Sequence, residues 1–133
     1  MFITESENLL QLAMSKPKNL LLIEDDFHIG EKLYNTAKGL DVIGKVSLSN
    51  NLKDGMAKLA EAEYDLVTLD LSLPDGNGIE LLKWLKEKEI KVKVFVFSMN
   101  IELKRICLKN GAIAFFDKSN DFDLLISNIA NSD

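Results

Sequence analysis

Short apolar runs separated by polar turn residues divide the chain from residue 19 onward into alternating segments. The runs at 20–23 (LLLI) and 66–69 (LVTL) are apolar without alternation, which is typical of strands covered on both faces. An alternating run, KVKVFVF, predicts another strand over 91–97. Weaker patterns predict two further strands, over 41–47 and 113–116.

Between these runs, apolar residues recur at three- or four-residue spacing, which predicts amphipathic helices. The first carries Ile29, Leu33 and Ala37 and closes at Gly39. Strand and helix alternate with short connections, so we expect an α/β fold with a doubly wound five-stranded parallel sheet. The other helices are expected over 51–63, from 79 past 85, over 101–110, and from a cap at Asn120 or Asp121 through 129.

The first 18 residues precede the first strong strand pattern. We predict that 1–18 form an N-terminal extension, either a tail or a short helix over 7–14, and that 19–133 form one domain. No repeat or linker divides that domain.

Composition excludes several classes of function. The formal charge of -5 disfavours direct binding to nucleic acid. A zinc site is not expected from one His and one Cys, and the lone Cys107 predicts a buried, inert thiol. No apolar segment reaches the length of a membrane span, and the N-terminus makes a poor signal peptide, so we expect a cytoplasmic protein.

Polar side chains stand where four of the predicted strands end. Glu24 and Asp25 follow the first strand, Asp70 the third, Ser98 the fourth and Lys118 the fifth. Each has an ordinary explanation alone, as a turn cap, a solvated lysine or a plain strand end. Because ligands of open parallel sheets bind beyond the carboxyl ends of the strands, the ordered set predicts a shared site.

Three carboxylates at one edge repel one another by about 4 kcal/mol per pair at ~4 Å near a surface. They therefore need a cation or raised pKa values, and hard oxygen ligands suit Mg²⁺ better than a transition metal. The acids could instead share a proton or turn into solvent as helix caps, as we expect for Asp26. Lys118 and Ser98 could both contact a phosphoryl group bound at Asp70.

The segments LLLIEDD, LDLSLPDGNG, FVFSMN and GAIAFFDKS, in this order, resemble the receiver domain of two-component response regulators over about 19–130. The resemblance implies a flavodoxin-like (βα)5 fold with strand order 2-1-3-4-5. It also implies a signalling switch rather than a turnover enzyme. Asp70 would take a phosphoryl group from a phosphohistidine on a histidine kinase or a histidine phosphotransfer protein. The protein-binding surface would then change for an unknown downstream protein, in a monomer or weak dimer.

The same resemblance assigns the site residues. Asp25 and Asp70 would bind Mg²⁺ directly, Glu24 through water, and the carbonyl of Ser72 would complete the protein ligands. Lys118 would hold the phosphoryl group.

Ser98 would swing toward the phosphoryl group and Phe115 would follow inward. This movement would repack a surface on which Ile101, Leu108 and Phe122 are candidate contacts. Phe115 and Phe116 also have an ordinary explanation as alternating strand residues, one to each face of the sheet.

Several positions depart from the common receiver pattern. Ser119 replaces a proline after Lys118, which leaves the geometry there open. Ser72 and Asn100 are the expected tuners of hydrolysis, and neither is a strong general base, so we predict a phosphoryl lifetime of minutes or longer. The alternatives are a receiver-like adaptor that works without phosphorylation and a Mg²⁺-dependent aspartyl phosphatase. The phosphatase is disfavoured because such enzymes place a second Asp where this chain has Ser72.

Overall fold

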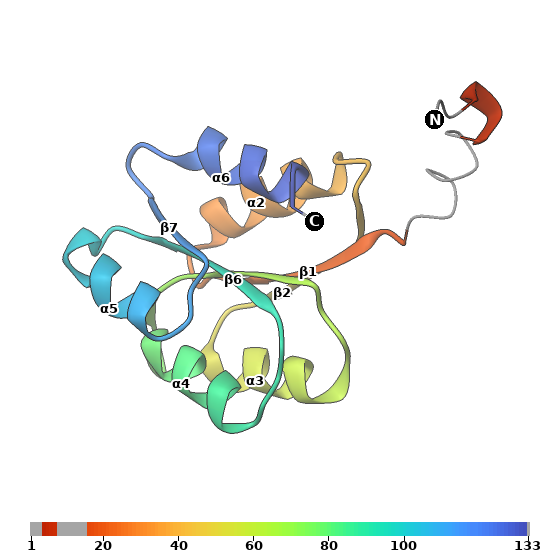
Figure 1. Ribbon diagram of the computed structural model, residues 1–133. Helices are drawn as coiled ribbons and strands as arrows, with labels where there is room; N and C mark the ends of the chain where they lie inside the picture. The colour runs from red at the N-terminus through yellow and green to blue at the C-terminus, as the bar shows by residue number, and fades with distance from the viewer. Residues whose placement is uncertain (1–3, 8–15, 133) are drawn as a thin grey trace.

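The computed structural model describes residues 4–7 and 16–132, and five parallel strands form its central sheet. The order β2-β1-β3-β6-β7 corresponds to 2-1-3-4-5 when only these strands are counted, which confirms the predicted fold (Figure 1). The strands are β1 (Lys18–Ile23), β2 (Ile43–Ser49), β3 (Leu66–Leu69), β6 (Lys93–Ser98) and β7 (Ala114–Asp117).

Helices cover both faces of this sheet (Figure 1). Alternate strand residues point to opposite faces of the sheet, so each strand contributes side chains to two hydrophobic cores. Leu20 and Leu22 pack in one core, whereas Leu21 and Ile23 pack in the other. Helices α2 (Phe27–Lys38) and α6 (Phe122–Ala130) cover the first core, and α3 (Leu52–Glu61), α4 (Ile79–Glu87) and α5 (Lys104–Lys109) cover the second.

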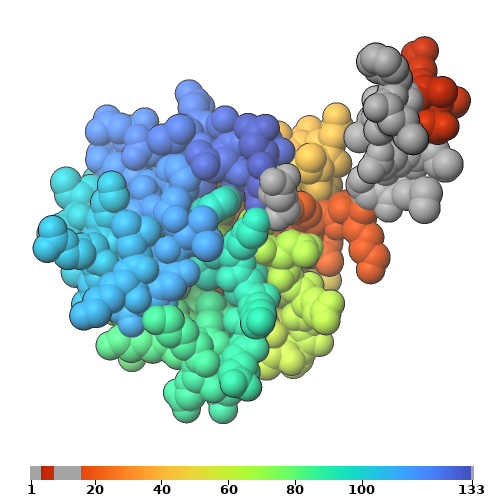
Figure 2. Space-filling model, in the orientation of Figure 1, coloured from red at the N-terminus to blue at the C-terminus, as the bar shows by residue number. Residues whose placement is uncertain are grey.

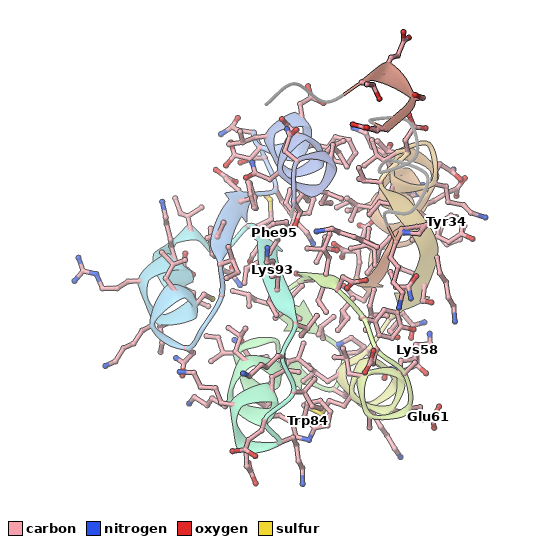
Figure 3. All side chains as sticks on the ribbon, turned by 45° about the vertical axis from the view of Figure 1, so that its right-hand side comes forward. Tyr34, Lys58, Glu61, Trp84, Lys93 and Phe95 are labelled. Atoms are coloured by element: carbon pink, nitrogen blue, oxygen red, sulfur yellow. The ribbon has the colours of Figure 1, made fainter. Side chains whose placement is uncertain are left out.

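Aromatic residues of β6 and β7 pack in the two hydrophobic cores between the sheet and the helices. Phe95 meets Phe116 edge to face, with ring centroids 5.7 Å apart, and Phe115 packs on the opposite face. The expectation of one phenylalanine to each face is therefore confirmed. Figure 3 shows Phe95 on β6 between the helical layers and Trp84 on α4.

Helix caps agree only in part with the sequence patterns. The Asp26 carboxylate accepts from the Ile29 amide at 3.0 Å and caps α2, as expected. Asp121 occupies the N-cap position of α6, as predicted, but its carboxylate accepts from the Asp117 amide at 2.9 Å and makes no capping bond. Competition from the backbone of the preceding turn explains the difference.

Two segments differ from their predicted structure. The segment after β3, where the sequence patterns predict no strand, contains the hairpin β4 (Ser72–Leu73) and β5 (Gly76–Asn77). The segment 101–110 was expected to be one helix, but it opens as a 3-10 turn, η1 (Ile101–Leu103), before α5 begins. After α5, Gly111 adopts φ 103°, a left-handed conformation that glycine allows at the end of a helix.

The N-terminal side of the chain is described in part. Strand β1 begins at Lys18, one residue before the predicted domain boundary. Thr4 and Glu7 exchange two hydrogen bonds, and both are exposed. Figure 2 shows the segment 4–7, in red, at one side of the view. The predicted helix over 7–14 lies mostly outside the described residues. Across 4–7 and 16–132, no helix has the length and apolarity to cross a membrane.

Candidate functional site

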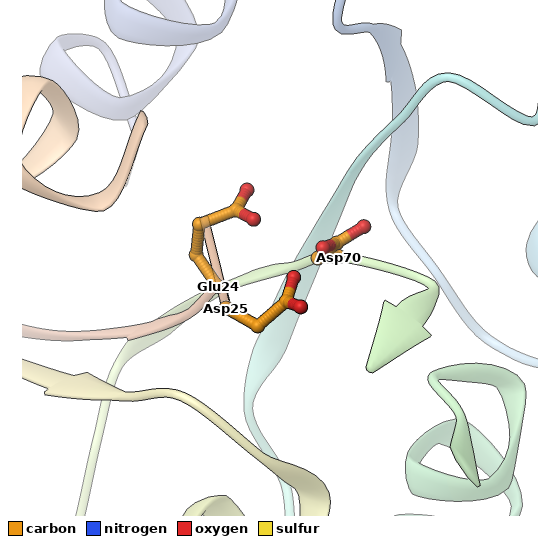
Figure 4. Close-up of side chains that lie close together, drawn as sticks. All are labelled: Glu24, Asp25 and Asp70. Carbon is orange, nitrogen blue, oxygen red and sulfur yellow. The ribbon is translucent and has the colours of Figure 1, made fainter. Parts of the chain in front are cut away.

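Three carboxylates meet at the carboxyl edge of the sheet because β1 and β3 are neighbours. Ile23 stands opposite Leu69 in the register, so the residues that follow each strand emerge side by side. Glu24, Asp25 and Asp70 each offer an oxygen within 4.8 Å of the others (Figure 4). Glu24 and Asp70 are buried, whereas Asp25 is exposed.

Lys118 joins this cluster from the end of the edge strand β7. Its Nζ lies 2.7 Å from Glu24 Oε1 and 3.2 Å from Asp70 Oδ2. All three side chains are nearly inaccessible to solvent, so the ammonium group neutralises part of a charge that water cannot screen. The predicted convergence of Lys118 on Asp70 is thus present, and the pairing with Glu24 was not foreseen.

The pKa values reflect this crowding. Burial raises the pKa of Glu24 to about 7, and the Asp70 carboxylate adds to that rise while Lys118 opposes it. Burial and then Asp70 also raise the pKa of Asp25. For Lys118, burial acts to lower the pKa, but hydrogen bonds and charges from Glu24 and Asp70 outweigh it and raise the value.

The donor set fits a hard divalent cation. Three carboxylates face a single ammonium group, so the cluster has more negative than positive groups when all are ionised. The exposure of Asp25 leaves one ligand open to incoming solvent and ions. Mg²⁺ prefers one or two carboxylates with several waters, which suits a half-open cluster of this kind.

Ser72 and Asn100 lie beside Asp70. The Ser72 amide donates to Asp70 Oδ1 at 3.2 Å, and the Ser72 hydroxyl accepts from Asn100 Nδ2 at 3.2 Å. The loops after β3 and β6 are therefore joined beside Asp70. Ser72 is exposed, so its side chain borders the opening of the site.

Ser98 lies at the end of β6, next to β3. It is buried, and its hydroxyl accepts from the Asn100 amide at 3.0 Å. The Ser98 carbonyl accepts from the Lys118 amide at 3.1 Å, which fixes the lysine backbone to the neighbouring strand. Phe115 is half-buried one strand further along, opposite Val96 in the register.

The turn after Lys118, which the sequence left open, is organised by Asp117. Its Oδ1 accepts from both the amide and the hydroxyl of Ser119, at 2.9 and 2.6 Å. The bond between Lys118 and Ser119 is trans, since no cis peptide bond occurs in the described part of the chain. An aspartate turn thus forms at the position where the common receiver pattern has a proline.

A close backbone approach also shapes the site. A Cβ on Gly78 would lie 2.5 Å from the Asp70 carbonyl oxygen, so only glycine fits without displacing the Asp70 backbone. The sequence pattern alone does not indicate this contact, because it depends on how the segment after β3 folds back toward Asp70.

The comparison with protein families decides the classification. The sequence model described as response regulator receiver domain matches residues 20–130. The chain belongs to this family. The predicted family is thereby confirmed, and the receiver domain accounts for the fold described above.

Relatives agree with this assignment. The receiver domain is 31% identical to the transcriptional regulatory protein MalR of Bacillus subtilis over 107 residues, which cover 79% of this chain and 46% of MalR. It is 31% identical to the nitrate/nitrite response regulator protein NarL of Escherichia coli over 112 residues, which cover 80% of this chain and 50% of NarL. The chain therefore spans about half the length of the curated relatives it matches.

Solved structures confirm the fold. The receiver domain of the Francisella response regulator 1452 aligns with a TM-score of 0.77 and 24% identity, over 84% of this chain and 93% of that one. The non-phosphorylated HemR receiver domain of Leptospira biflexa aligns with a TM-score of 0.75 and 26% identity, over 89% of this chain and 97% of that one.

Proposed function

We propose that this receiver domain is a phosphorylation-dependent signalling switch in which Asp70 accepts a phosphoryl group from a phosphohistidine. The observation that carries the proposal is the setting of Asp70. It lies beside two further carboxylates within 4.8 Å and 3.2 Å from the buried ammonium group of Lys118. A lone turn aspartate would need neither the acids nor a buried lysine.

The transfer step follows from these contacts. An oxygen of Asp70 attacks the phosphorus, a P–O bond forms, the P–N bond to the donor histidine breaks, and that imidazole leaves with the electron pair and takes up a proton. Lys118, already 3.2 Å from Asp70 Oδ2, can follow the phosphoryl oxygens as negative charge gathers there. Mg²⁺ held by Asp25, Asp70, the Ser72 carbonyl and, through water, Glu24 would supply the remaining neutralising charge.

The switch would run through Ser98 and Phe115. A phosphoryl group adds nearly two negative charges and three acceptor oxygens at one point. The Ser98 hydroxyl can leave its present bond from the Asn100 amide and donate to one of those oxygens. Its movement opens space toward which the half-buried Phe115 can turn, and the surface around α5 repacks.

Partners follow from the same chemistry. The donor would be a histidine kinase or a histidine phosphotransfer protein, because these carry phosphohistidine. A downstream protein would meet the altered surface, where Ile101 and Leu108 are exposed and Phe122 is half-buried. The domain would not act as a turnover enzyme.

The phosphoryl group should persist for minutes or longer. Ser72 and Asn100 hydrogen-bond to each other at 3.2 Å beside Asp70, and neither can strongly activate an attacking water. A half-life of about a second would contradict this part of the proposal.

One experiment tests the function directly. The protein is incubated with Mg²⁺ and acetyl phosphate, and intact mass spectrometry follows the wild type, Asp70→Asn and the off-site control Asp54→Asn. We expect a gain of one phosphoryl group in the wild type and the control, and none in Asp70→Asn. Continuous phosphate release without accumulation would indicate a phosphatase, and no gain at all would indicate an adaptor. Either result would overturn the proposal.

A further inference from the structure

Asp75, in the turn of the hairpin that follows Asp70, holds the N-terminus of a different element. Its Oδ1 accepts from the Leu52 amide at 2.8 Å and its Oδ2 from the Lys53 amide at 2.9 Å. These are the first two residues of α3, whose amides have no partner within the helix. The two bonds lower the pKa of the Asp75 carboxyl below its ordinary value, which keeps it ionised.

The topology gives this contact its importance. In the sheet, β1 lies between β2 and β3, so the acids after β1 are flanked by the loops after those two strands. Asp75 belongs to the loop after β3, and Leu52 follows the loop after β2. Their hydrogen bonds therefore clamp the two flanking loops together beside the end of β1, where Asp25 stands.

The clamp is packed as well as hydrogen-bonded. The next residue, Gly76, has φ 152°, and a Cβ there would lie 2.8 Å from the side chain of Leu52. Leu52 is itself buried in the core. The hairpin backbone thus lies close to the Leu52 side chain, and its φ of 152° favours glycine at position 76.

The path from the clamp to the reacting carboxylate is short. The hairpin pairs Ser72 with Asn77, and the Ser72 amide donates to Asp70 Oδ1 at 3.2 Å. Fixing the turn at Asp75 therefore fixes the strand that carries the Ser72 amide and carbonyl. A free hairpin would let both groups move relative to Asp70.

We propose that Asp75 is a positioning residue, which holds the hairpin against α3 so that Ser72 and Asp70 are preset for cation binding and phosphoryl acceptance. The role in phosphoryl acceptance rests on the proposed function, whereas the contact between the hairpin and α3 rests on the hydrogen bonds of Asp75. A cap that served only α3 would stabilise the helix and leave the site unaffected.

The test compares Asp75→Ala and Asp75→Asn with the control Asp54→Ala in the full chain. Asp54 is also in the first turn of α3, and Asp54→Ala removes the same charge together with an ion pair to Lys58. Within the described residues, the Asp54 carboxylate bonds to Lys58 and not to the hairpin. Calorimetric titration with MgCl₂ gives the affinity. Amide hydrogen exchange at Ser72 reports the hairpin without any metal.

We expect Asp75→Ala to weaken Mg²⁺ binding roughly tenfold and to speed exchange of the Ser72 amide by a similar factor. Asp75→Asn keeps one acceptor oxygen and should recover most of both losses. Asp54→Ala should change neither, although it lowers stability.

Equal losses of Mg²⁺ affinity in Asp75→Ala and Asp54→Ala would show a simple charge effect and overturn the inference. A rate of hydrogen exchange at the Ser72 amide that is the same in Asp75→Ala as in the wild type would also overturn the inference. If the wild type itself binds no Mg²⁺ and takes up no phosphoryl group, the proposed function fails, while the exchange measurement still decides whether the clamp holds Ser72.

Discussion

Replacing Lys118 with methionine should reveal how the buried cluster is balanced. Methionine keeps most of the aliphatic length of lysine and removes its charge. In the wild type, Nζ lies 2.7 Å from Glu24 and 3.2 Å from Asp70. At an effective dielectric constant of about 20, these pairs attract by about 6 and 5 kcal/mol, and the cost of desolvating the ions offsets much of that gain.

Breaking a buried ion pair by removing one partner typically costs about 3–5 kcal/mol, because a charge is left buried without compensation. We expect a loss in this range for Lys118→Met at pH 8.5. At pH 6 the loss should fall to about 1–2 kcal/mol, because the pKa of Glu24 is about 7 and the wild-type carboxyl is then already mostly protonated.

Urea denaturation at the two pH values, with and without MgCl₂, measures these losses. Lys58→Met is the matched control, since Lys58 pairs with Asp54 at 3.0 Å but the two side chains are 33% and 47% exposed. That pair should contribute less than about 1 kcal/mol at either pH. Mg²⁺ should stabilise Lys118→Met more than the wild type, because the cation replaces the missing charge. Equal losses for the two lysines at pH 8.5 would refute the reasoning.

Three further predictions concern single side chains of the site. Without metal, the folded chain keeps the Glu24 proton from pH 4.5 up to about 7 whereas the unfolded chain releases it, so stability falls across this range. Glu24→Gln has no such proton to lose. Its unfolding free energy minus that of the wild type, measured by denaturant titration, should therefore rise by about 2–3 kcal/mol from pH 5 to pH 8. A difference that stays constant with pH would contradict this prediction. Gly78→Ala should lower the free energy of unfolding, measured in urea, by about 1–3 kcal/mol because its Cβ meets the Asp70 carbonyl. Gly39→Ala should lower it far less, because the nearest atom to its Cβ is 3.5 Å away. Equal losses for the two variants would count against the close approach at Gly78. Ser98→Ala leaves a backbone amide without its acceptor and should cost about 1–2 kcal/mol, with slower phosphoryl uptake in the mass assay; wild-type uptake would argue against a role for the hydroxyl.

The sheet was predictable because its central strands are nearly continuous apolar runs. LLLI at 20–23 and LVTL at 66–69 are buried on both faces, and short apolar runs bounded by turn residues are typical of covered strands. The convergence of Glu24, Asp70 and Lys118 was predictable for a related reason. Parallel strands end at one edge, so residues that follow them meet there whatever the local propensities.

The connections were harder to predict because they depend on contacts between distant residues. The hairpin at 72–77 has strands of two residues, too short to leave a periodic pattern. Asp75 looks like any turn aspartate until α3 is placed beside it. Aspartate is a common helix-capping residue, yet the Asp121 carboxylate accepts a hydrogen bond from the Asp117 amide and not from its own helix. The pairing of Lys118 with Glu24 likewise depends on side-chain reach across the sheet.

That pairing also bears on the edge of the sheet. Strand β7 has only four residues and one neighbour in the sheet, so edge fraying should open it before the inner strands. Lys118 ties its end to carboxylates that follow β1 and β3, across the intervening β6. When an anion at Asp70 draws Lys118 to a new partner, or a cation competes with Lys118 for the carboxylates, the strength of that tie changes. Hydrogen-exchange protection of the β7 amides would then report the chemical state of a site two strands away.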